Sequence, residues 1–330
     1  MSQVIFDGLS RLAPKLWGPG AVVEDLERLS GGASMETWAF ALAGPKGRRE
    51  LVLRRRTLPV DEKTSRAIPL ASEAALIMAA RACGVPVAPI VHVAAPEDGL
   101  AEAHITERIG GEALGRKIVE DPRFDAVRPT LARQCGEILA RIHGMTPPDI
   151  GLRIFEAGQE LDYYEAVYRS SGAQRPVMEL AFRHLREHLP PPVQLTVVHS
   201  DFRNGNLMID ETAGVAAVLD WESAHLGDPA EDLGWLCVNS WRFGRADRPV
   251  GGFGGYEDLL EGYARAGGKG MSLSRLLYRQ ALGSLKWGVM CLTMYGAYAN
   301  GSNTSVERPM IGRRVSETEI DLLHLLENGL

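Results

Sequence analysis

The chain has 330 residues, with 36 Lys and Arg against 42 Asp and Glu, so its formal net charge at neutral pH is −6. Hydrophobic residues make up 45% of the chain and charged residues 24%, which excludes a mainly disordered protein and favours a globular one with a large core. A mildly acidic chain without a block of Lys and Arg is also not typical of nucleic-acid-binding proteins, because phosphate contacts supply most of their affinity. We therefore expect no nucleic-acid partner.

The cysteines and the apolar segments indicate in which cellular compartment the protein is expected. Four cysteines occur far apart and without a CxxC pair, namely Cys83, Cys135, Cys237 and Cys291. This pattern indicates neither a disulfide framework nor a zinc–thiolate site. The first twenty residues do not resemble a secretory signal, and residues 281–299 contain Lys286 and three glycines, which predicts a buried core helix rather than a membrane span. We expect a cytoplasmic monomer or homodimer without a membrane partner.

The first third of the chain is rich in expected strands. Alternating or continuous apolar runs between Gly and Pro breakers predict strands at residues 22–29, 37–42, 50–56, 88–94 and 103–109. The first two flank a glycine turn and predict a hairpin. Residues 71–82 read as a helix that ends before Gly84 and Pro86. Five strands and one helix indicate a small α+β lobe.

After Gly110 and Gly111 the patterns become mainly helical. Apolar residues at helical spacing predict an amphipathic helix that carries Leu131, Cys135, Ile138, Leu139 and Ile142. Further helices are expected at residues 161–170, 177–188, 257–266, 273–299 and 316–326, with short strands at 195–198, 207–209 and 215–219. The fold class is therefore predicted as α+β, with an antiparallel-sheet lobe over residues 1–109, including an N-terminal helical extension, and a mainly helical lobe over 110–330.

The densest polar cluster lies between two of the short expected strands. Asp201 precedes Asn206 by five residues, and Asp220 follows nineteen residues after Asp201 at the end of another strand. Phosphoryl transfer needs one carboxylate to orient the attacking hydroxyl and accept its proton, and a second carboxylate with an amide oxygen to hold Mg²⁺. The D-x-x-x-x-N spacing is that of the kinase catalytic loop. The cluster therefore predicts a phosphotransferase site.

At this point the chain resembles the aminoglycoside phosphotransferase (protein-kinase-like) family, and more narrowly the phosphotransferases related to the kinase domain fused to some acyl-CoA dehydrogenases. The residues responsible are VVHSDFRNGNLMID, VLDWESAHLGDPAEDLGWL, IGRRVSETEIDLL, LSGGASMETWAF and LVLRRR. The resemblance implies a bilobal kinase-like fold that uses ATP and Mg²⁺. It implies that Asp201 is the catalytic base, that Asn206 and Asp220 are Mg²⁺ ligands, and that His199 braces the segment around Asp220.

The nucleotide would be bound by the N-terminal lobe. The glycine turn, formed by Ser30, Gly31, Gly32, Ala33 and Ser34, lets backbone N–H groups approach phosphate oxygens without a Cβ clash. The turn departs from the G-x-G-x-x-G pattern, so the prediction of phosphate binding rests on the position of the turn between two strands. The expected hinge, which includes Glu107 and Ile109, would read the adenine edge with backbone groups.

Two arginines are assigned to the phosphates. Arg54 stands where such kinases carry lysine, and Glu73 on the next expected helix is its natural partner. A guanidinium keeps its charge and can fork onto a carboxylate and a phosphate oxygen, although an ordinary surface ion pair is the alternative interpretation. Arg203 is hypothesised to reach the transferred phosphoryl group as its charge builds. Asp228 is expected to be a structural N-cap, with Pro229 at the first helical position.

The expected function is transfer of the ATP γ-phosphoryl group to the hydroxyl of a small molecule. The stretch expected to face this acceptor is aromatic and basic, which favours a hydroxyacyl-CoA or related hydroxy acid over a polycationic aminoglycoside; its residues are Trp235, Asn239, Trp241, Arg242, Phe243 and Arg245. Aminoglycoside phosphorylation and a catalytically impaired nucleotide-binding regulator remain the alternatives. A third, a zinc hydrolase, rests on the short pattern His184-Leu-Arg-Glu187-His188, which is a frequent false positive.

Overall fold

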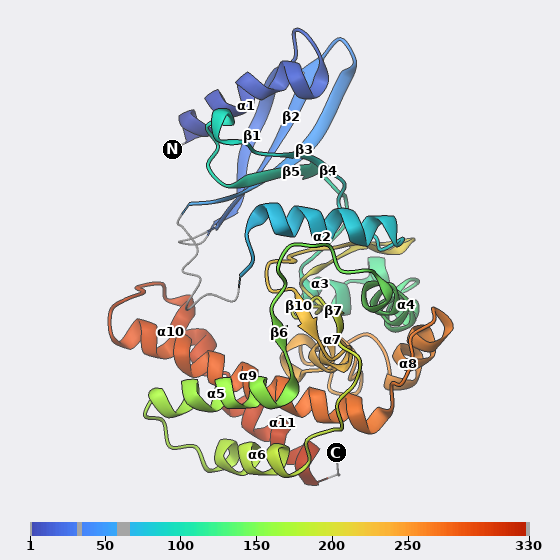
Figure 1. Ribbon diagram of the computed structural model, residues 1–330, viewed down its shortest axis with the longest axis vertical. Coiled ribbons are helices and arrows are strands. Elements are labelled where there is room, and N and C mark those ends of the chain that lie inside the picture. Colours follow the sequence, from blue (N-terminus) through green and yellow to red (C-terminus); the bar gives the residue numbers. More distant parts are fainter. Residues whose placement is uncertain (1, 32–34, 58–66, 328–330) are drawn as a thin grey trace. The chain divides into compact units, whose positions relative to one another are not determined.

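The computed structural model describes residues 2–31, 35–57 and 67–327. These residues form two compact units (Figure 1). Unit 1 comprises Met1–Gly111 together with Thr146–Leu152 and Ala216–Ala224. Unit 2 comprises Glu112–Met145, Arg153–Val215 and His225–Leu330. Two later segments of the chain thus belong to unit 1, so its composition depends on contacts between residues far apart in sequence.

Unit 1 is built on a five-stranded antiparallel sheet with the strand order β1-β2-β3-β5-β4. The strands are β1 (Val22–Gly31), β2 (Met35–Gly44), β3 (Gly47–Arg56), β4 (Ile90–Val93) and β5 (Ala103–Glu107). β1 and β2 pair directly as the expected hairpin, and Ser30 lies opposite Thr37 at its end. The predicted strands are therefore present, with the last two shorter than expected.

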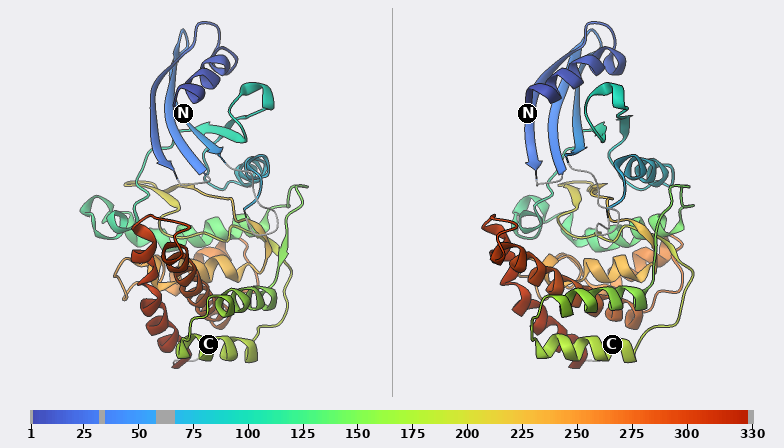
Figure 2. Two further views of the ribbon diagram at one scale, coloured as in Figure 1. Left: turned by 90° about the vertical axis from the view of Figure 1, so that its left-hand side faces the viewer. Right: turned by 60° about the vertical axis from the view of Figure 1, so that its left-hand side comes forward.

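Helix α1 (Ser2–Trp17) covers one face of this sheet (Figure 2). Ile5, Leu9 and Leu12 recur at helical spacing and are buried against sheet residues such as Phe40 and Leu53. Helix α2 (Leu70–Ala82) contacts β4 and β5 and carries Glu73 in its first turn. The buried positions of α1 explain why this N-terminal helical extension packs as part of the sheet's core.

Unit 2 is mainly helical. Its helices are α3 (Gly115–Glu120), α4 (Leu131–Gly144), α5 (Ala157–Ser170), α6 (Pro176–Glu187), α7 (Ala230–Leu236), α8 (Tyr256–Arg265), α9 (Leu273–Ala299), α10 (Glu307–Gly312) and α11 (Val315–Glu327), with short 3-10 turns that include η4 (Asn239–Trp241). The remaining strands along the chain are β6 (Ile154–Phe155), β7 (Thr196–Val198), β8 (Leu207–Asp210), β9 (Gly214–Val218) and β10 (His225–Gly227). All five apolar positions that predicted α4 are buried. The predicted α+β class is confirmed.

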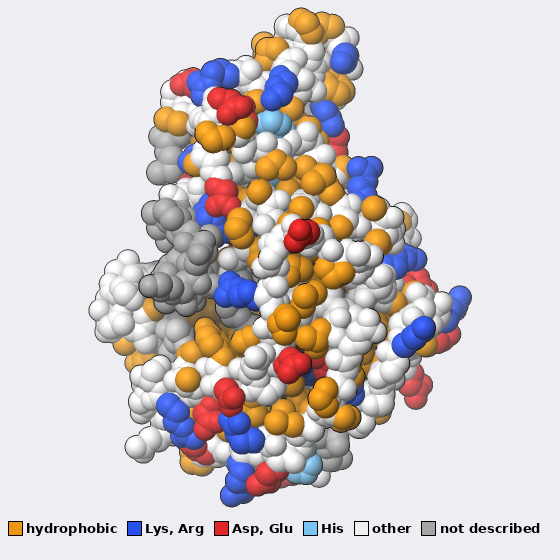
Figure 3. All heavy atoms as spheres, viewed as in Figure 1, with side chains coloured by type: hydrophobic (Ala, Val, Ile, Leu, Met, Phe, Trp, Pro, Cys, Tyr) orange, Lys and Arg blue, Asp and Glu red, His pale blue; other side chains and the backbone are white. Residues whose placement is uncertain are grey.

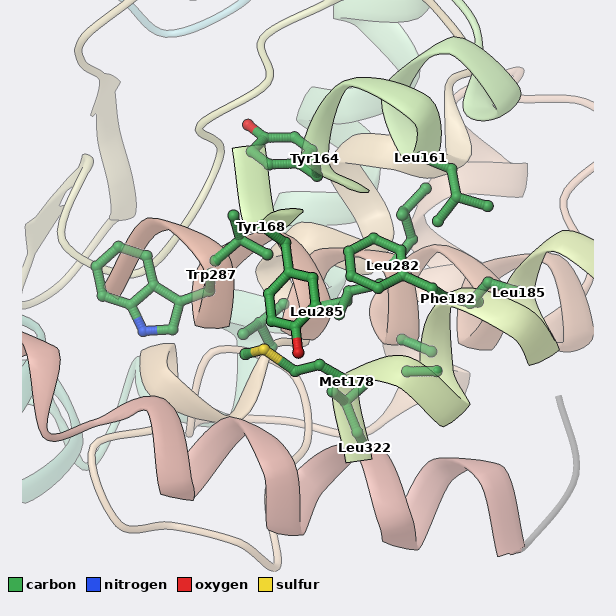
Figure 4. Packing of buried hydrophobic residues seen from close by; sticks show 14 of the residues in the cluster. Leu161, Tyr164, Tyr168, Met178, Phe182, Leu185, Leu282, Leu285, Trp287 and Leu322 are labelled. Atoms are coloured by element: carbon green, nitrogen blue, oxygen red, sulfur yellow. The ribbon is translucent and has the colours of Figure 1, made fainter. Parts of the chain in front are cut away.

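The core of unit 2 forms where α5, α6, α9 and α11 meet (Figure 4). Tyr168, Met178, Phe182 and Leu285 interdigitate there and are almost completely buried. Helix α9 was expected to be a buried core helix, and it is buried as far as Cys291. Its C-terminal turns are more exposed. Among the described helices, none has the length and apolar character needed to span a membrane.

The differences from the expected elements concern short segments. Helix α7 begins at Ala230 with Pro229 as its N-cap, so Asp228, the expected N-cap, lies one residue before the observed cap position. Its carboxylate still accepts the N–H of Ala230, at 3.0 Å, and also pairs with Arg275 and Arg279. Strands β6 and β10 and helix α3 were not predicted, because segments of two to six residues carry no periodic signal.

Charged side chains are mixed on the visible face of the molecule. In Figure 3 the Lys and Arg side chains are interspersed with Asp and Glu rather than gathered in one patch. This face therefore presents no block of one sign.

Candidate active site

Asp220 lies in a tight segment of unit 1 that follows β9. Asp220 has a positive φ of 65°, a conformation that Asp tolerates better than most residues. The next residue, Trp221, is completely buried, and its indole N–H donates to the carbonyl of Val218 at 3.2 Å. The backbone N–H of Ile68 donates to the carbonyl of Glu222 at 2.8 Å. The buried tryptophan thus anchors a segment that carries a carboxylate on either side of it.

Arg54 on β3 gathers three carboxylates within the same unit. Its Nε lies 3.5 Å from Glu73 Oε2, and its Nη2 donates to Asp220 Oδ1 at 2.6 Å and to Glu222 Oε2 at 2.8 Å. Glu73 is almost completely buried, and the Arg54 side chain is only 19% exposed. Because these contacts come from β3, α2 and the segment after β9, they do not correspond to the surface ion pair of the alternative interpretation.

The charges of this cluster depend on one another. Burial opposes the charged guanidinium, but Glu73, Asp220 and Glu222 outweigh it and hold the pKa of Arg54 above its usual value. Burial likewise opposes an ionised Glu73, but nearby His104 and Arg54 keep its pKa below the ordinary range. Burial and then the adjacent Asp220 charge raise the pKa of Glu222 despite Arg54. One cation therefore neutralises more than one negative charge here.

Replacing Arg54 should destabilise unit 1. In Arg54→Met the buried Glu73 loses its guanidinium partner, and we expect the free energy of unfolding to fall by about 3 kcal/mol at neutral pH. Arg54→Lys keeps a positive charge and should recover most of that loss. Urea unfolding of the two variants and the wild type measures the difference. Equal stability of the wild type and the methionine variant would contradict this expectation.

The expected hinge lies at the end of β5. The backbone N–H of Glu107 donates to the carbonyl of Pro89 at 3.0 Å, and that of Arg108 to the carbonyl of Glu50 at 3.1 Å. The Glu107 carboxylate is held by Arg49. Within the described residues the backbone N–H of Ile109 makes no hydrogen bond with another backbone group.

The expected glycine turn is described only in part. Ser30 and Gly31 end strand β1, and Gly31 lies opposite Glu36 of β2. Gly32, Ala33 and Ser34 lie outside the described residues. Their assignment to nucleotide binding therefore stays a prediction.

In unit 2 the polar loop between β7 and β8 is held through its backbone by residues of α7. The N–H groups of His199 and Ser200 both donate to the carboxylate of Asp232, at 2.8 and 2.7 Å, and Asp232 is completely buried. Ser200 has a positive φ of 68°, and its hydroxyl donates to Glu231 at 3.0 Å. Helix α7 therefore fixes a strained backbone immediately before Asp201.

Three N–H donors surround the Asp201 carboxylate. Arg203 Nε and Trp235 Nε1 donate to Oδ1 at 3.0 and 2.7 Å, and Asn206 Nδ2 donates to Oδ2 at 2.6 Å. Asn206 Nδ2 also donates to the Asp201 carbonyl at 3.0 Å. A carboxylate held in this way has a fixed orientation, which a group that must meet a substrate hydroxyl requires.

Each unit by itself leaves side-chain atoms of the kinds that bind Mg²⁺ or phosphate. With its amide nitrogen bound to Asp201, Asn206 keeps its side-chain oxygen free of hydrogen bonds from the described residues, and such an oxygen is a ligand that Mg²⁺ accepts. Asp220 accepts from Arg54 with Oδ1, which leaves Oδ2 without a hydrogen bond from Arg54. The terminal nitrogens of Arg203 donate no hydrogen bond within the described chain, and its guanidinium stacks 4.6 Å from the Trp241 ring centroid.

The predicted site residues thus fall into two groups, each described within its own unit. Unit 2 brings together Asp201, Arg203 and Asn206, and unit 1 brings together Arg54, Glu73 and Asp220. Glu107 and Ile109 lie elsewhere in unit 1, at the end of the central sheet.

Two residues expected to face the acceptor are engaged elsewhere. Arg242 is buried, and its guanidinium donates to the carbonyls of Cys237 and Pro249. Arg245 donates weakly to the carbonyl of Val119 and pairs with its neighbour Asp247. Arg242 therefore stabilises the turn after α7, and the basic character inferred for this stretch is weaker than the sequence indicated.

A buried ion network lies behind Trp235. Arg279 pairs with Glu160 and Asp228, and Lys286 lies 3.3 Å from Glu160 and 3.6 Å from Glu231. Burial opposes the charge of Asp228, but Arg279 and Arg275 outweigh it and keep its pKa below the usual range. This network explains the structural role expected of the Asp228 motif.

The zinc interpretation lacks support in the described residues. The rings of His184 and His188 stack on each other, with centroids 4.1 Å apart, at the end of α6. No group of three or more His, Cys, Asp and Glu side chains in the described part of the chain is arranged to hold a metal ion.

Solved structures with the same fold are phosphotransferases and kinases of small molecules. A candidate aminoglycoside phosphotransferase from Ralstonia eutropha JMP134 superposes with a TM-score of 0.74 at 20% identity, covering 100% of this chain and 99% of the other. A macrolide 2'-phosphotransferase from Brachybacterium faecium gives 0.61 at 19% identity, covering 93% and 96%. The fold is therefore the bilobal protein-kinase-like fold.

The family follows from the sequence match. The model of the phosphotransferase enzyme family matches residues 25–268, and the chain belongs to that family. Its curated relatives include acyl-CoA dehydrogenase family member 10 of Mus musculus, 34% identical over 134 residues, which are 37% of this chain and 12% of that protein. Family member 11 of Pongo abelii is 25% identical over 62% of this chain and 28% of its own. The chain thus matches well under a third of the length of these relatives.

Two contacts in the site were missed by the sequence reasoning. Glu222 joins Asp220 on Arg54, and an alternating Asp-x-Glu at a strand end is the signal that could have indicated it. Trp235 donates to Asp201 rather than only facing an acceptor. It lies three residues after Asp232 on α7, so helical spacing places both side chains toward the same loop.

Proposed function

We propose that this enzyme transfers the γ-phosphoryl group of ATP to a hydroxyl of a small molecule. Asp201 accepts the hydroxyl proton, the hydroxyl oxygen bonds to phosphorus, and the bond from phosphorus to the ADP oxygen breaks. The observation that carries this proposal is the Asp201 carboxylate held by Asn206 Nδ2 at 2.6 Å, while no described residue donates a hydrogen bond to the amide oxygen of Asn206.

The proposal assigns Mg²⁺ to Asn206 and Asp220. When bound, the ion neutralises phosphate charge. Arg54, held by Glu73, binds phosphate oxygens. The terminal guanidinium nitrogens of Arg203, which donate to no other described residue, bind the charge that builds on the transferred group. Adenine is assigned to the segment that ends β5, where the backbone N–H of Ile109 has no backbone partner among the described residues. The glycine turn from Ser30 to Ser34 is assigned to the phosphates.

We further propose a hydroxyacyl-CoA or related hydroxy acid as the acceptor. The names of the curated relatives point to acyl-CoA chemistry. Beside Asp201 lie the Trp241 ring and the Arg203 guanidinium, which suit an acceptor with apolar and anionic parts. The buried carboxylates of Glu160 and Glu231 are paired with Lys286, so they are not free to bind a polycationic aminoglycoside.

An acceptor screen tests the function. The purified protein is given ATP with and without Mg²⁺ and a panel of hydroxyacyl-CoA esters, free hydroxy acids, aminoglycosides and simple alcohols, and ADP release is measured. We expect Mg²⁺-dependent turnover with a hydroxyacyl-CoA or hydroxy acid. Turnover with aminoglycosides alone would overturn the acceptor assignment. Tight binding of Mg²⁺·ATP without turnover would favour the impaired regulator, and no nucleotide binding would refute the function itself.

A further inference from the structure

The indole N–H of Trp235 makes the shorter of the two contacts to Oδ1 of Asp201. It donates at 2.7 Å, against 3.0 Å for Arg203 Nε. An ionised carboxylate has about four lone-pair positions, two on each oxygen. Both positions on Oδ1 are thus occupied, and Asn206 Nδ2 occupies one on Oδ2. Among the described residues, one position on Oδ2 is left for a substrate hydroxyl.

The surroundings of Trp235 hold its ring in one place. The residue is 3% exposed, and its ring packs 5.3 Å from Trp241, centroid to centroid. A Cβ atom at Gly283 of α9 would lie only 3.2 Å from the Trp235 ring carbon Cε3, so this glycine is what allows the close approach. The indole N–H is therefore aimed at Asp201 by packing rather than by the hydrogen bond alone.

A buried cation lies over the same ring. Lys286 Nζ is 4.6 Å from the Trp235 ring centroid and is held there by Glu160 and Glu231. A cation on the ring face draws on the electron density of the indole and strengthens its N–H as a donor. Glu231 also accepts the hydroxyl of Ser200, the residue before Asp201. The ion network and the catalytic loop are thus connected through α7.

From these contacts we propose that Trp235 is a positioning residue for phosphoryl transfer, which occupies Oδ1 of Asp201 so that Oδ2 accepts the proton of the acceptor hydroxyl. This inference rests on the proposed function. It assigns to Trp235 a role that its burial alone does not require, because a phenylalanine would fill the same core position. Its chemical content lies in the single N–H group that phenylalanine lacks.

The test compares Trp235→Phe with Trp287→Phe. Trp287 lies in the same aromatic core, is 8% exposed, and its N–H has no hydrogen-bond partner among the described residues, so it is the matched control. We expect Trp235→Phe to lower kcat about tenfold while the KM for ATP and the melting temperature stay close to those of the wild type. Trp287→Phe should stay within about twofold of the wild-type kcat. Unchanged kcat in Trp235→Phe would overturn the inference.

A spectroscopic readout does not depend on turnover. In protein labelled with ¹⁵N-tryptophan, the indole N–H resonance of Trp235 is assigned by through-bond experiments and compared between the wild type and Asp201→Asn. We expect this resonance to move upfield when the charged acceptor is removed, while that of Trp287 stays in place. An unmoved Trp235 resonance would overturn the inference even in an active enzyme. Absence of turnover in the wild type with every acceptor would instead count against the proposed function.

Discussion

Asp201→Asn should abolish nearly all turnover while nucleotide binding survives. The substitution keeps the size of the side chain and removes the group that accepts the hydroxyl proton, so we expect kcat to fall by about 10²–10⁴. Arg203, Asn206 and Trp235 donate N–H hydrogen bonds to the Asp201 carboxylate. The single amide oxygen of the asparagine variant can still accept some of these hydrogen bonds. ADP release with the acceptor found in the screen gives kcat, and calorimetry with Mg²⁺·ATP gives the binding constant.

The matched control for this loss is Asp210→Asn. Asp210 ends β8, and its carboxylate accepts the N–H groups of Thr212 and Ala213 in an exposed turn. The control removes one negative charge from the same stretch of chain without touching the Asp201 carboxylate, and we expect its kcat within about twofold of the wild type. A comparable kcat in Asp201→Asn and Asp210→Asn would rule out Asp201 as the base.

Asp232→Ala should produce the largest loss of stability. The carboxylate is completely buried and accepts hydrogen bonds from the backbone of His199 and Ser200 and from His143 Nε2 at 3.0 Å. Its removal leaves these donors without partners and leaves a cavity. Because each unsatisfied buried donor costs about 1–3 kcal/mol, we expect the free energy of unfolding to fall by about 4 kcal/mol. Urea denaturation followed by circular dichroism measures the change.

Tyr263→Phe is the control that distinguishes the contribution of the Asp232 carboxylate from that of the hydrogen-bond network around it. The Tyr263 hydroxyl lies 3.0 Å from His143 Nδ1, so the substitution removes one hydrogen bond two steps from the loop. We expect a loss of about 1 kcal/mol and nearly unchanged kcat. If Asp232→Ala were no less stable than Tyr263→Phe, the carboxylate would not be the anchor of the loop before Asp201.

The sequence carried the local information well. Helix α4 was predicted from its apolar positions, and all of them are buried. This prediction was possible because the period of an amphipathic helix appears in residues three or four positions apart. The hairpin of β1 and β2 followed from a glycine turn between two strand patterns. The spacing of Asp201 and Asn206 indicated their proximity, because five residues in one tight loop bring two side chains within hydrogen-bond distance.

Tertiary contacts decided what each side chain near the site does. Arg242 was expected to face an acceptor but binds the carbonyls of Cys237 and Pro249, since a buried guanidinium takes the acceptors that packing offers. Arg54 donates to Glu222, which lies 168 positions later in the chain, and no local sequence pattern predicts a contact between residues so far apart in sequence.

The same distinction explains the catalytic loop. The sequence by itself determined the longer elements of this protein and the residue types of its phosphotransferase motifs, because these depend on periodicity and short spacing. Only the tertiary structure decided that Trp235, 34 positions after Asp201, donates to its carboxylate, and that the buried Asp232 holds the loop backbone. Side-chain direction at such positions is set by packing between α7 and α9, which involves residues from distant parts of the chain.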